Sequence, residues 1–287
     1  MYRESGEVDI MAISYRKLWI QLIDRNMNKT ELREVSGITT NALAALGKDE
    51  RVTTDVLNKI CLALKCDVGD IMEILPDEEY KKMIEMRVLS APFVCRTKDL
   101  LWYRETKQCI ELLKEGKTLD EIKELSQNEN IFNAASSSRA DNIRVVTARR
   151  VKSVNEEFLD FFTSQDAMTQ KQLCIVLVML TDRTFYEFMN NIFREKMILG
   201  VSELFDSDLI GFVHRLQESD ERIAKWSDAA VIKVRDNYKH ILKEAEFISE
   251  SGTTREIVRP IVSDAMKTFL QDEGLTPIYK ILAGENV

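Results

Sequence analysis

Apolar and polar residues alternate at the spacing of amphipathic helices over almost the whole chain. Residues 11–76 read as five short helices, and further helices follow one another toward the C-terminus. Helix-breaking residues are scarce: of the four prolines, only Pro92 lies within the 183 residues from Asp77 to Arg259. The pattern therefore predicts an all-α protein.

A helix-turn-helix is predicted between residues 28 and 47. Asn28 is placed to cap the first helix, and Glu31 completes a capping-box-like pair. Gly37 tolerates positive φ and ends that helix, after which Thr39 or Thr40 caps the second. Five apolar residues are spaced to lock the helices together at a steep angle: Leu32, Val35, Ile38, Leu43 and Leu46. A plain helical hairpin with a glycine turn is the alternative, which the presence of five suitable helices disfavours.

The second of these helices is expected to enter the major groove of DNA. Its outward residues would be Thr39, Thr40, Asn41, Ala44 and Ala45. Asn41 is the side chain best suited to read an adenine edge with two hydrogen bonds. The two small alanines allow close approach and contact with thymine methyl groups.

Charge in this segment is balanced, with nine Lys and Arg against nine Asp and Glu in residues 11–76. Binding should therefore depend on a few placed contacts rather than on overall charge. The candidates for phosphate contact are Arg16, Lys17, Arg33 and Lys48, and each could instead be an ordinary solvated charge. Lys29 and Thr30, which open the first helix, complete the expected DNA-contacting set.

Residues 11–76 resemble the lambda repressor/Cro-type (XRE) DNA-binding domains. The resemblance is carried by Tyr15–Trp19, Lys29–Arg33, Gly37–Asn41, Leu46–Lys48, Val56–Ile60 and Cys66–Glu73. The chain departs from the wider family at Lys29, where many members carry a glutamine that braces the phosphate contacts. The resemblance implies a five-helix DNA-binding domain and puts that one contact in doubt.

A linker is expected over residues 77–89, followed by a larger helical domain over 90–287. Thr118 and Glu121 form a capping box there. The most distinctive feature is a long basic helix from Ser136 to about Lys152. Residues 134–155 hold five basic residues and one acidic residue, a local charge of +4. This helix is interpreted either as a DNA-contacting face or as a solvated face paired with neighbouring carboxylates.

Residues from about 90 to 287 resemble the BrxA family of BREX bacteriophage-exclusion systems. The matching segments are Trp102–Gly116, Leu119–Ile122, Glu129–Phe132, Ser138–Arg139, Arg149–Arg150, Asn155–Leu159, Phe185–Lys196, Asp208–Phe212 and Trp226–Leu242. The resemblance implies an all-helical, NusB-like fold and DNA binding. It extends the expected DNA-contacting set by Ser138, Arg139, Arg144, Arg149, Arg150, Lys152 and Arg194.

Composition limits the remaining possibilities. The net charge of −8 argues against coating of nucleic acid through overall charge. The five cysteines are expected to be free thiols, and the longest apolar run, Leu173 to Leu180, is far shorter than the ~20 residues of a membrane span. The short apolar run and the polar, acidic N-terminus together predict a cytoplasmic protein that is not associated with a membrane.

No catalytic motif is found, and neither a cofactor nor a metal ion is expected. Our first hypothesis is a non-enzymatic, double-stranded-DNA-binding component of a phage-defence system, with other BREX components and a second copy of the chain as candidate partners. The second is a transcription regulator whose C-terminal domain senses a ligand or dimerises. The third, an RNA-binding factor, depends on analogy with the NusB-like fold alone.

Overall fold

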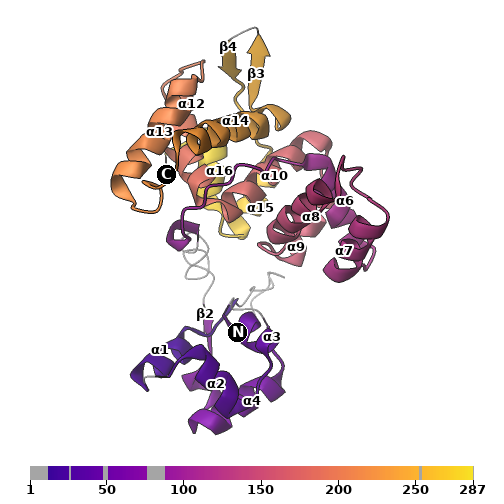
Figure 1. Cartoon of the computed structure of the whole chain (residues 1–287), viewed down its shortest axis with the longest axis vertical. Helices are drawn as coiled ribbons and strands as arrows, with labels where there is room; N and C mark the ends of the chain where they lie inside the picture. Colours follow the sequence, from indigo (N-terminus) through magenta and orange to yellow (C-terminus); the bar gives the residue numbers. More distant parts are fainter. Residues whose placement is uncertain (1–11, 26, 48–50, 76–87, 252–253, 287) are drawn as a thin grey trace, which may run out of the picture. The chain divides into compact units, whose positions relative to one another are not determined.

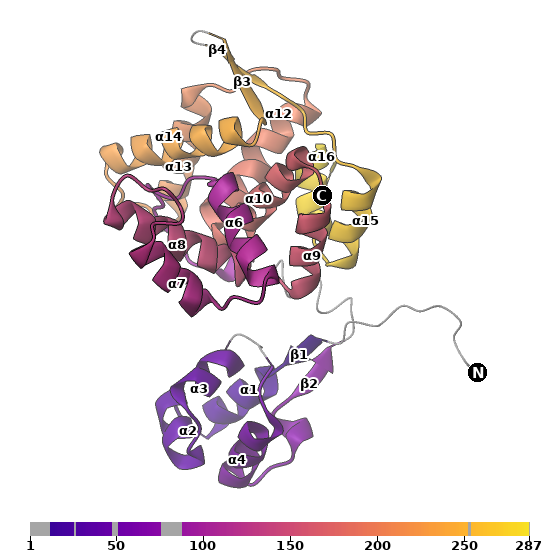
Figure 2. The same cartoon turned by 90° about the vertical axis from the view of Figure 1, so that its right-hand side faces the viewer.

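The computed structural model describes residues 12–25, 27–47, 51–75, 88–251 and 254–286. The chain divides into two compact units, Met1–Ile84 and Glu85–Val287. Each unit is built mainly from helices, as Figures 1 and 2 show. The expected linker lies largely in residues 76–87, outside the described residues.

The N-terminal unit contains four α-helices in its described part: α1 (Arg16–Asp24), α2 (Lys29–Ser36), α3 (Thr40–Leu46) and α4 (Thr54–Leu64). The expected fifth helix is a single 3₁₀ turn, η1 (Val68–Asp70). Strand β1 (Ala12–Ser14) pairs antiparallel with β2 (Glu73–Leu75), Ile13 opposite Ile74. The five short helices that the sequence predicts are therefore present, the last as a 3₁₀ turn, and the chain after η1 is extended and pairs with β1.

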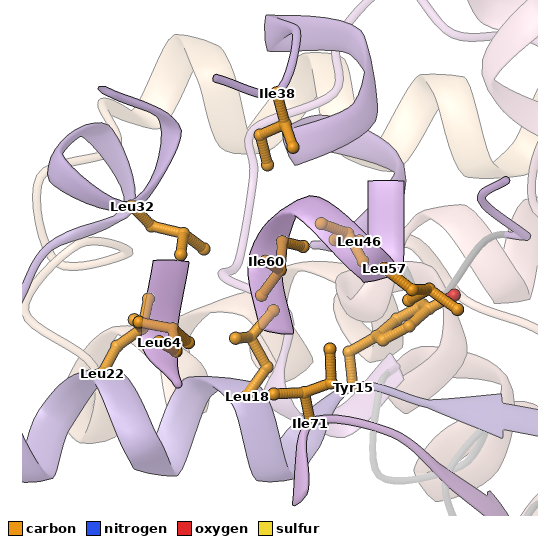
Figure 3. Close-up of a cluster of buried hydrophobic side chains, with 10 residues drawn as sticks. All are labelled: Tyr15, Leu18, Leu22, Leu32, Ile38, Leu46, Leu57, Ile60, Leu64 and Ile71. Carbon is orange, nitrogen blue, oxygen red and sulfur yellow. The ribbon is translucent and has the colours of Figure 1, made fainter. Parts of the chain in front are cut away.

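Ten buried side chains form the core of this unit: Tyr15, Leu18, Leu22, Leu32, Ile38, Leu46, Leu57, Ile60, Leu64 and Ile71 (Figure 3). They come from α1 to α4 and from the segments that join or flank these helices. Val35 is 57% exposed, so the prediction that it locks α2 to α3 was wrong. The core-facing pair of α2 is Leu32 and Ser36, four residues apart, and Val35 lies about 100° away from Ser36.

The C-terminal unit contains α6 (Tyr103–Lys114), α7 (Leu119–Asn128), α8 (Ser137–Val151), α9 (Glu156–Ser164), α10 (Ala167–Thr181), α11 (Arg183–Phe188), the π-helical turn η2 (Met189–Phe193), α12 (Arg194–Ile198), α13 (Asp206–Ser219), α14 (Asp228–Glu244), α15 (Asp264–Asp272) and α16 (Thr276–Ala283). Helix α10 is central, and α6, α8, α9 and α11 pack against it. Its residues 172–179 are all buried, so the apolar run from Leu173 to Leu180 belongs to a core helix.

A β-hairpin interrupts the helical pattern near the C-terminus. Strand β3 (Ile248–Ser251) pairs antiparallel with β4 (Thr254–Ile257), and Ile248 lies opposite Ile257. The amide of Leu204 donates to the carbonyl of Arg255, which attaches a third extended segment. Within the described residues, no helix is both long and apolar enough to cross a bilayer.

Candidate nucleic-acid interface

Helix α2 begins with a complete capping box. The side chain of Asn28 accepts hydrogen bonds from the amides of Thr30 (2.9 Å) and Glu31 (3.0 Å), and the Glu31 carboxylate accepts from the Asn28 amide (2.7 Å). The helix ends at Gly37, whose φ of 67° lies in the left-handed region that glycine adopts without strain. These local predictions are confirmed.

Helix α3 is capped by Thr39, whose hydroxyl accepts from the amide of Ala42 at 3.1 Å. The two candidates for this cap are thereby resolved, and Thr40 is the first residue of the helix. The Thr40 hydroxyl accepts a hydrogen bond from Arg33 of α2 at 3.3 Å. Helices α2 and α3 are thus joined by a polar contact as well as by the core.

The outer face of α3 presents small and polar side chains. Thr39, Thr40, Asn41 and Ala44 are exposed, whereas Ala45 is half-buried beside the fully buried Leu46. Among the described residues, no hydrogen bond engages the Asn41 amide, which leaves its donor and acceptor available to a ligand. Because these side chains are small, the helix can approach another surface closely.

The basic side chains around α3 differ in their availability. The Lys29 ammonium lies 4.2 Å from the centre of the Trp19 ring, a cation–π contact that places it beside α1. Lys17 donates to the Gly69 carbonyl and lies 3.6 Å from the Glu73 carboxylate, so its charge is partly used within the domain. Arg16 is exposed. Lys48 lies outside the described residues.

Helix α8 of the C-terminal unit starts at the cap that Ser136 provides to the amide of Arg139. Ser138 and Arg139 are exposed at this end. Arg144, one turn further on, forms an ion pair with Asp141 at 2.6 Å. The first turns of α8 therefore combine one available cation with one that is locally neutralised.

Arg149 and Arg150 have separate structural roles. Arg149 pairs with Asp99 at 2.6 Å, and its side chain is 31% exposed. Arg150 is 1% exposed, and its guanidinium donates to the backbone carbonyls of Leu100 and Leu101. Burial lowers the pKa of Arg150 to about 10. The prediction that Arg150 contacts DNA was wrong, because the guanidinium has no access to a phosphate.

The segment that receives these arginines was missed by sequence analysis. Asp99, Leu100 and Leu101 precede α6 and lie about 50 residues before Arg149 and Arg150 in the chain. Asn237 of α14 also donates to the backbone carbonyl of Asp99, at 2.8 Å. No local pattern signals such contacts, because they join segments that are far apart in sequence.

The two remaining predicted cations lie elsewhere. Lys152 is exposed at the C-cap of α8, about 20 Å along the helix axis from Arg139. Arg194 follows the π-helical turn η2 and is half-buried, and its Nε and Nη1 atoms have no hydrogen-bond partner. The structure thus gathers the α3 residues on one face, but it does not bring the C-terminal cations together as one continuous basic face.

The fold and these faces define a helix-turn-helix unit joined to a larger helical unit. Residues 17–77 match the model of the Cro/C1-type HTH DNA-binding domain, so the N-terminal unit contains a helix-turn-helix of this type. Over 62 residues, the chain is 42% identical to the uncharacterized HTH-type transcriptional regulator YozG of Bacillus subtilis (strain 168). This alignment covers 21% of this chain and 74% of the relative. The chain is also similar to the crystal structure of transcriptional regulator VanUg, with 51% identity and a TM-score of 0.24. That alignment covers 26% of this chain and 99% of the VanUg chain.

The larger unit has its own relatives. Residues 96–274 match the BrxA family model, and the chain is 31% identical over 185 residues to the BREX protein BrxA of Bacillus cereus (strain H3081.97). That alignment covers 64% of this chain and 92% of the relative. The protein therefore belongs to the BrxA family. A crystal structure of an uncharacterized protein from Magnetospirillum magneticum shares its fold, with a TM-score of 0.58, 16% identity, and coverage of 68% of this chain and 100% of that one.

Proposed function

We propose that this protein is a non-enzymatic, double-stranded-DNA-binding component of a BREX-type bacteriophage defence system. The observation that carries the proposal is the exposed outer face of α3 within a helix-turn-helix domain, in a chain that belongs to the BrxA family. In this proposal α3 enters the major groove, and the BrxA domain makes a second set of contacts to the same or a neighbouring DNA segment.

Recognition of bases is assigned to α3. Asn41 offers one donor and one acceptor, which matches the N7 and N6 positions of adenine. Ala44 is small and exposed, and suits contact with a thymine methyl group. Thr39 and Thr40 lie at the start of the helix, where the amides favour a phosphate oxygen. Arg33 positions Thr40 through the hydrogen bond that joins the two helices.

Contacts to the DNA backbone by the BrxA domain are assigned to Arg139 and Lys152, with Ser138 beside the former. Both cations are exposed and form no ion pair among the described residues. Arg144 and Arg149 are secondary candidates because each must leave a carboxylate partner to reach a phosphate. Arg194 is the weakest candidate, because its unpartnered Nε and Nη1 atoms are buried and would have to become exposed to reach a phosphate.

The proposal is tested with the full-length protein by selecting a preferred duplex from a random-sequence DNA pool and then measuring affinity across salt concentrations. We expect the protein to select a specific site and Asn41→Ala to weaken its affinity for that site. Asn58→Ala of α4 is the matched control, since Asn58 is also exposed but lies outside α3. Failure to retain any duplex at low salt would overturn the proposal. Stronger competition by single-stranded RNA than by duplex DNA would favour an RNA-binding role instead.

A second candidate function is transcription regulation. It is favoured by the relationship of the N-terminal domain to an HTH-type transcriptional regulator over 62 residues. Such a regulator, acting as a homodimer, would bind two half-sites about 34 Å apart, centre to centre. Footprinting on the promoter of its own gene distinguishes the two, because a palindromic protected site there supports the regulator and its absence supports the defence component.

A further inference from the structure

Two cysteines meet at the end of α4. The helix ends at Leu64, and Lys65 adopts the left-handed conformation with φ 52°. The amides of Lys65 and Cys66 both point back to the carbonyl of Cys61, the latter at 3.1 Å. A helix end of this kind, the Schellman motif, brings together the side chains three places before and two places after the cap, which here are Cys61 and Cys66.

The two thiols lie near enough that Cys66 helps to raise the pKa of Cys61, and both are accessible. Both side chains are half-buried, and both line an open, largely apolar groove of about 840 Å³. Helix α4 supplies half of the lining residues, including the 70% exposed Leu62, and the segment through η1 supplies Val68 and Met72. None of the lining residues belongs to α3, so the groove is separate from the DNA-reading face.

The other cysteines lack this arrangement. Cys109 and Cys174 are buried in the C-terminal unit, and burial raises their pKa values to about 11 and about 12. Cys95 is half-buried, and its pKa is raised by burial and by Asp182 rather than by a second thiol. The chain therefore contains one accessible dithiol and three internal controls.

We propose that Cys61 and Cys66 form a modification site, in which hydrogen peroxide oxidises the pair to an intrachain disulfide. One thiolate attacks the peroxide oxygen, giving a sulfenic acid and releasing hydroxide. The second thiol then displaces the sulfenic oxygen as water and the S–S bond forms. Two sulfurs lose two electrons in total, and the peroxide O–O bond is reduced to two water molecules when its second oxygen takes up the released protons.

Two hydrogen bonds from α1 hold the segment that carries the two cysteines in place. From α1, Arg25 donates to the carbonyl of Leu64 at 2.6 Å and Gln21 donates to the carbonyl of Asp70 at 3.1 Å. Burial, together with the neighbouring thiol and carboxylates, raises the pKa of Cys61. Thiolate is the reactive form, so oxidation that begins at Cys61 should be faster at pH 8.5 than at pH 7.

The experiment treats reduced, full-length protein with hydrogen peroxide at pH 8, alkylates the remaining thiols and digests the product with trypsin. Cleavage after Lys59, Lys65 and Lys81 separates the two cysteines into peptides 60–65 and 66–81. The disulfide therefore appears as a cross-linked pair of peptides that a reductant separates. We expect Cys61 and Cys66 to lose alkylation together, with Cys95→Ser, the control variant, behaving like the wild type.

Single variants and a second reagent make the outcome decisive. In Cys61→Ser the remaining Cys66 should form sulfenic and sulfinic acids and no disulfide. Phenylarsine oxide, which joins two neighbouring thiols through two As–S bonds and releases water, should bind untreated wild-type protein at one per chain and block both residues. The proposal is overturned if peroxide leaves Cys61 alkylatable while Cys66 is over-oxidised, or if phenylarsine oxide protects neither residue.

Discussion

Arg149 and Arg150 are adjacent in sequence but have opposite environments. Arg149 lies at the surface of the C-terminal unit, paired with Asp99 at 2.6 Å, whereas Arg150 is 1% exposed and satisfies two backbone carbonyls. Neighbours on a helix point about 100° apart, which is enough to place one in the core and one at its edge. Two basic residues in a row therefore do not make a basic surface.

Replacement of Arg150 by Met should destabilise the protein strongly. The carbonyls of Leu100 and Leu101 would lose their donors inside the core, at a cost of about 3 kcal/mol in the free energy of unfolding. Urea unfolding of the full chain, followed for the C-terminal unit, measures this change. The matched control is Arg149→Met, for which at most about 1 kcal/mol is expected, since Asp99 keeps its contact with Arg96. Equal losses in the two variants would contradict the structural role of Arg150.

Asn41→Ala should weaken binding to a specific duplex by about 1–3 kcal/mol and change binding to random DNA little. The reason is that Asn41 is exposed on the outer face of α3, where its amide can recognise a base edge. Fluorescence anisotropy with both kinds of duplex measures the difference. Equal weakening on both would show that Asn41 does not read a base.

Short-range features of the fold were predictable from sequence. The capping box of Asn28 and Glu31, the helix end at Gly37 and the cap of α8 at Ser136 all involve residues within four positions of each other. Side chains and backbone groups that are at most four positions apart lie within about one helical turn, so the local sequence is enough to identify the contact. The same holds for the capping box at Thr118.

Long-range pairings were not predictable. Strand β1 pairs with β2 across about 60 residues, and Asp99 reaches α8 across 50. The helical period also does not decide which of two adjacent residues faces the core. For this reason Val35 was predicted to be buried, whereas the neighbouring Ser36 is the buried residue. For the candidate site, this means that the outer face of α3 was visible in the sequence, whereas the state of each α8 arginine depended on partners from other segments.

The buried Asp182 should make stability depend on pH. Burial raises its pKa to about 6, although Arg96 and the amide of Phe185 favour the ionised form. The folded protein therefore binds this proton more readily than the unfolded chain, whose aspartate has a pKa of about 3.9. Stability from this group is full below about pH 4 and is lost as the pH rises through about 6. Asp182→Asn retains a side-chain oxygen for the cap, so its unfolding free energy minus that of the wild type should increase between pH 4.5 and pH 7. An unchanged difference would contradict the raised pKa.

Residues 1–78 should fold without the remainder of the chain. The core of the N-terminal unit is made from its own helices, and its polar ties, such as Arg25 to the Leu64 carbonyl, are also internal. Circular dichroism of the fragment should show a helical spectrum with a cooperative thermal transition, and the fragment should bind duplex DNA weakly because it holds ten basic against fourteen acidic residues. A spectrum typical of an unfolded chain would show that the boundary is wrong.

The contribution of the BrxA domain to DNA binding should appear in the salt dependence of affinity. Arg139 and Lys152 are the exposed cations at the two ends of α8, and each phosphate contact contributes about 0.9 to the slope of log affinity against log salt. Arg139→Glu and Lys152→Glu should each lower the slope of the full-length protein by about that amount, while Lys233→Glu, an exposed cation on α14, leaves it unchanged. Arg149→Glu should have a smaller effect because Asp99 already neutralises the arginine. If the slope stays the same in folded Arg139→Glu and Lys152→Glu proteins, α8 is a solvated face and the helix-turn-helix domain alone binds DNA.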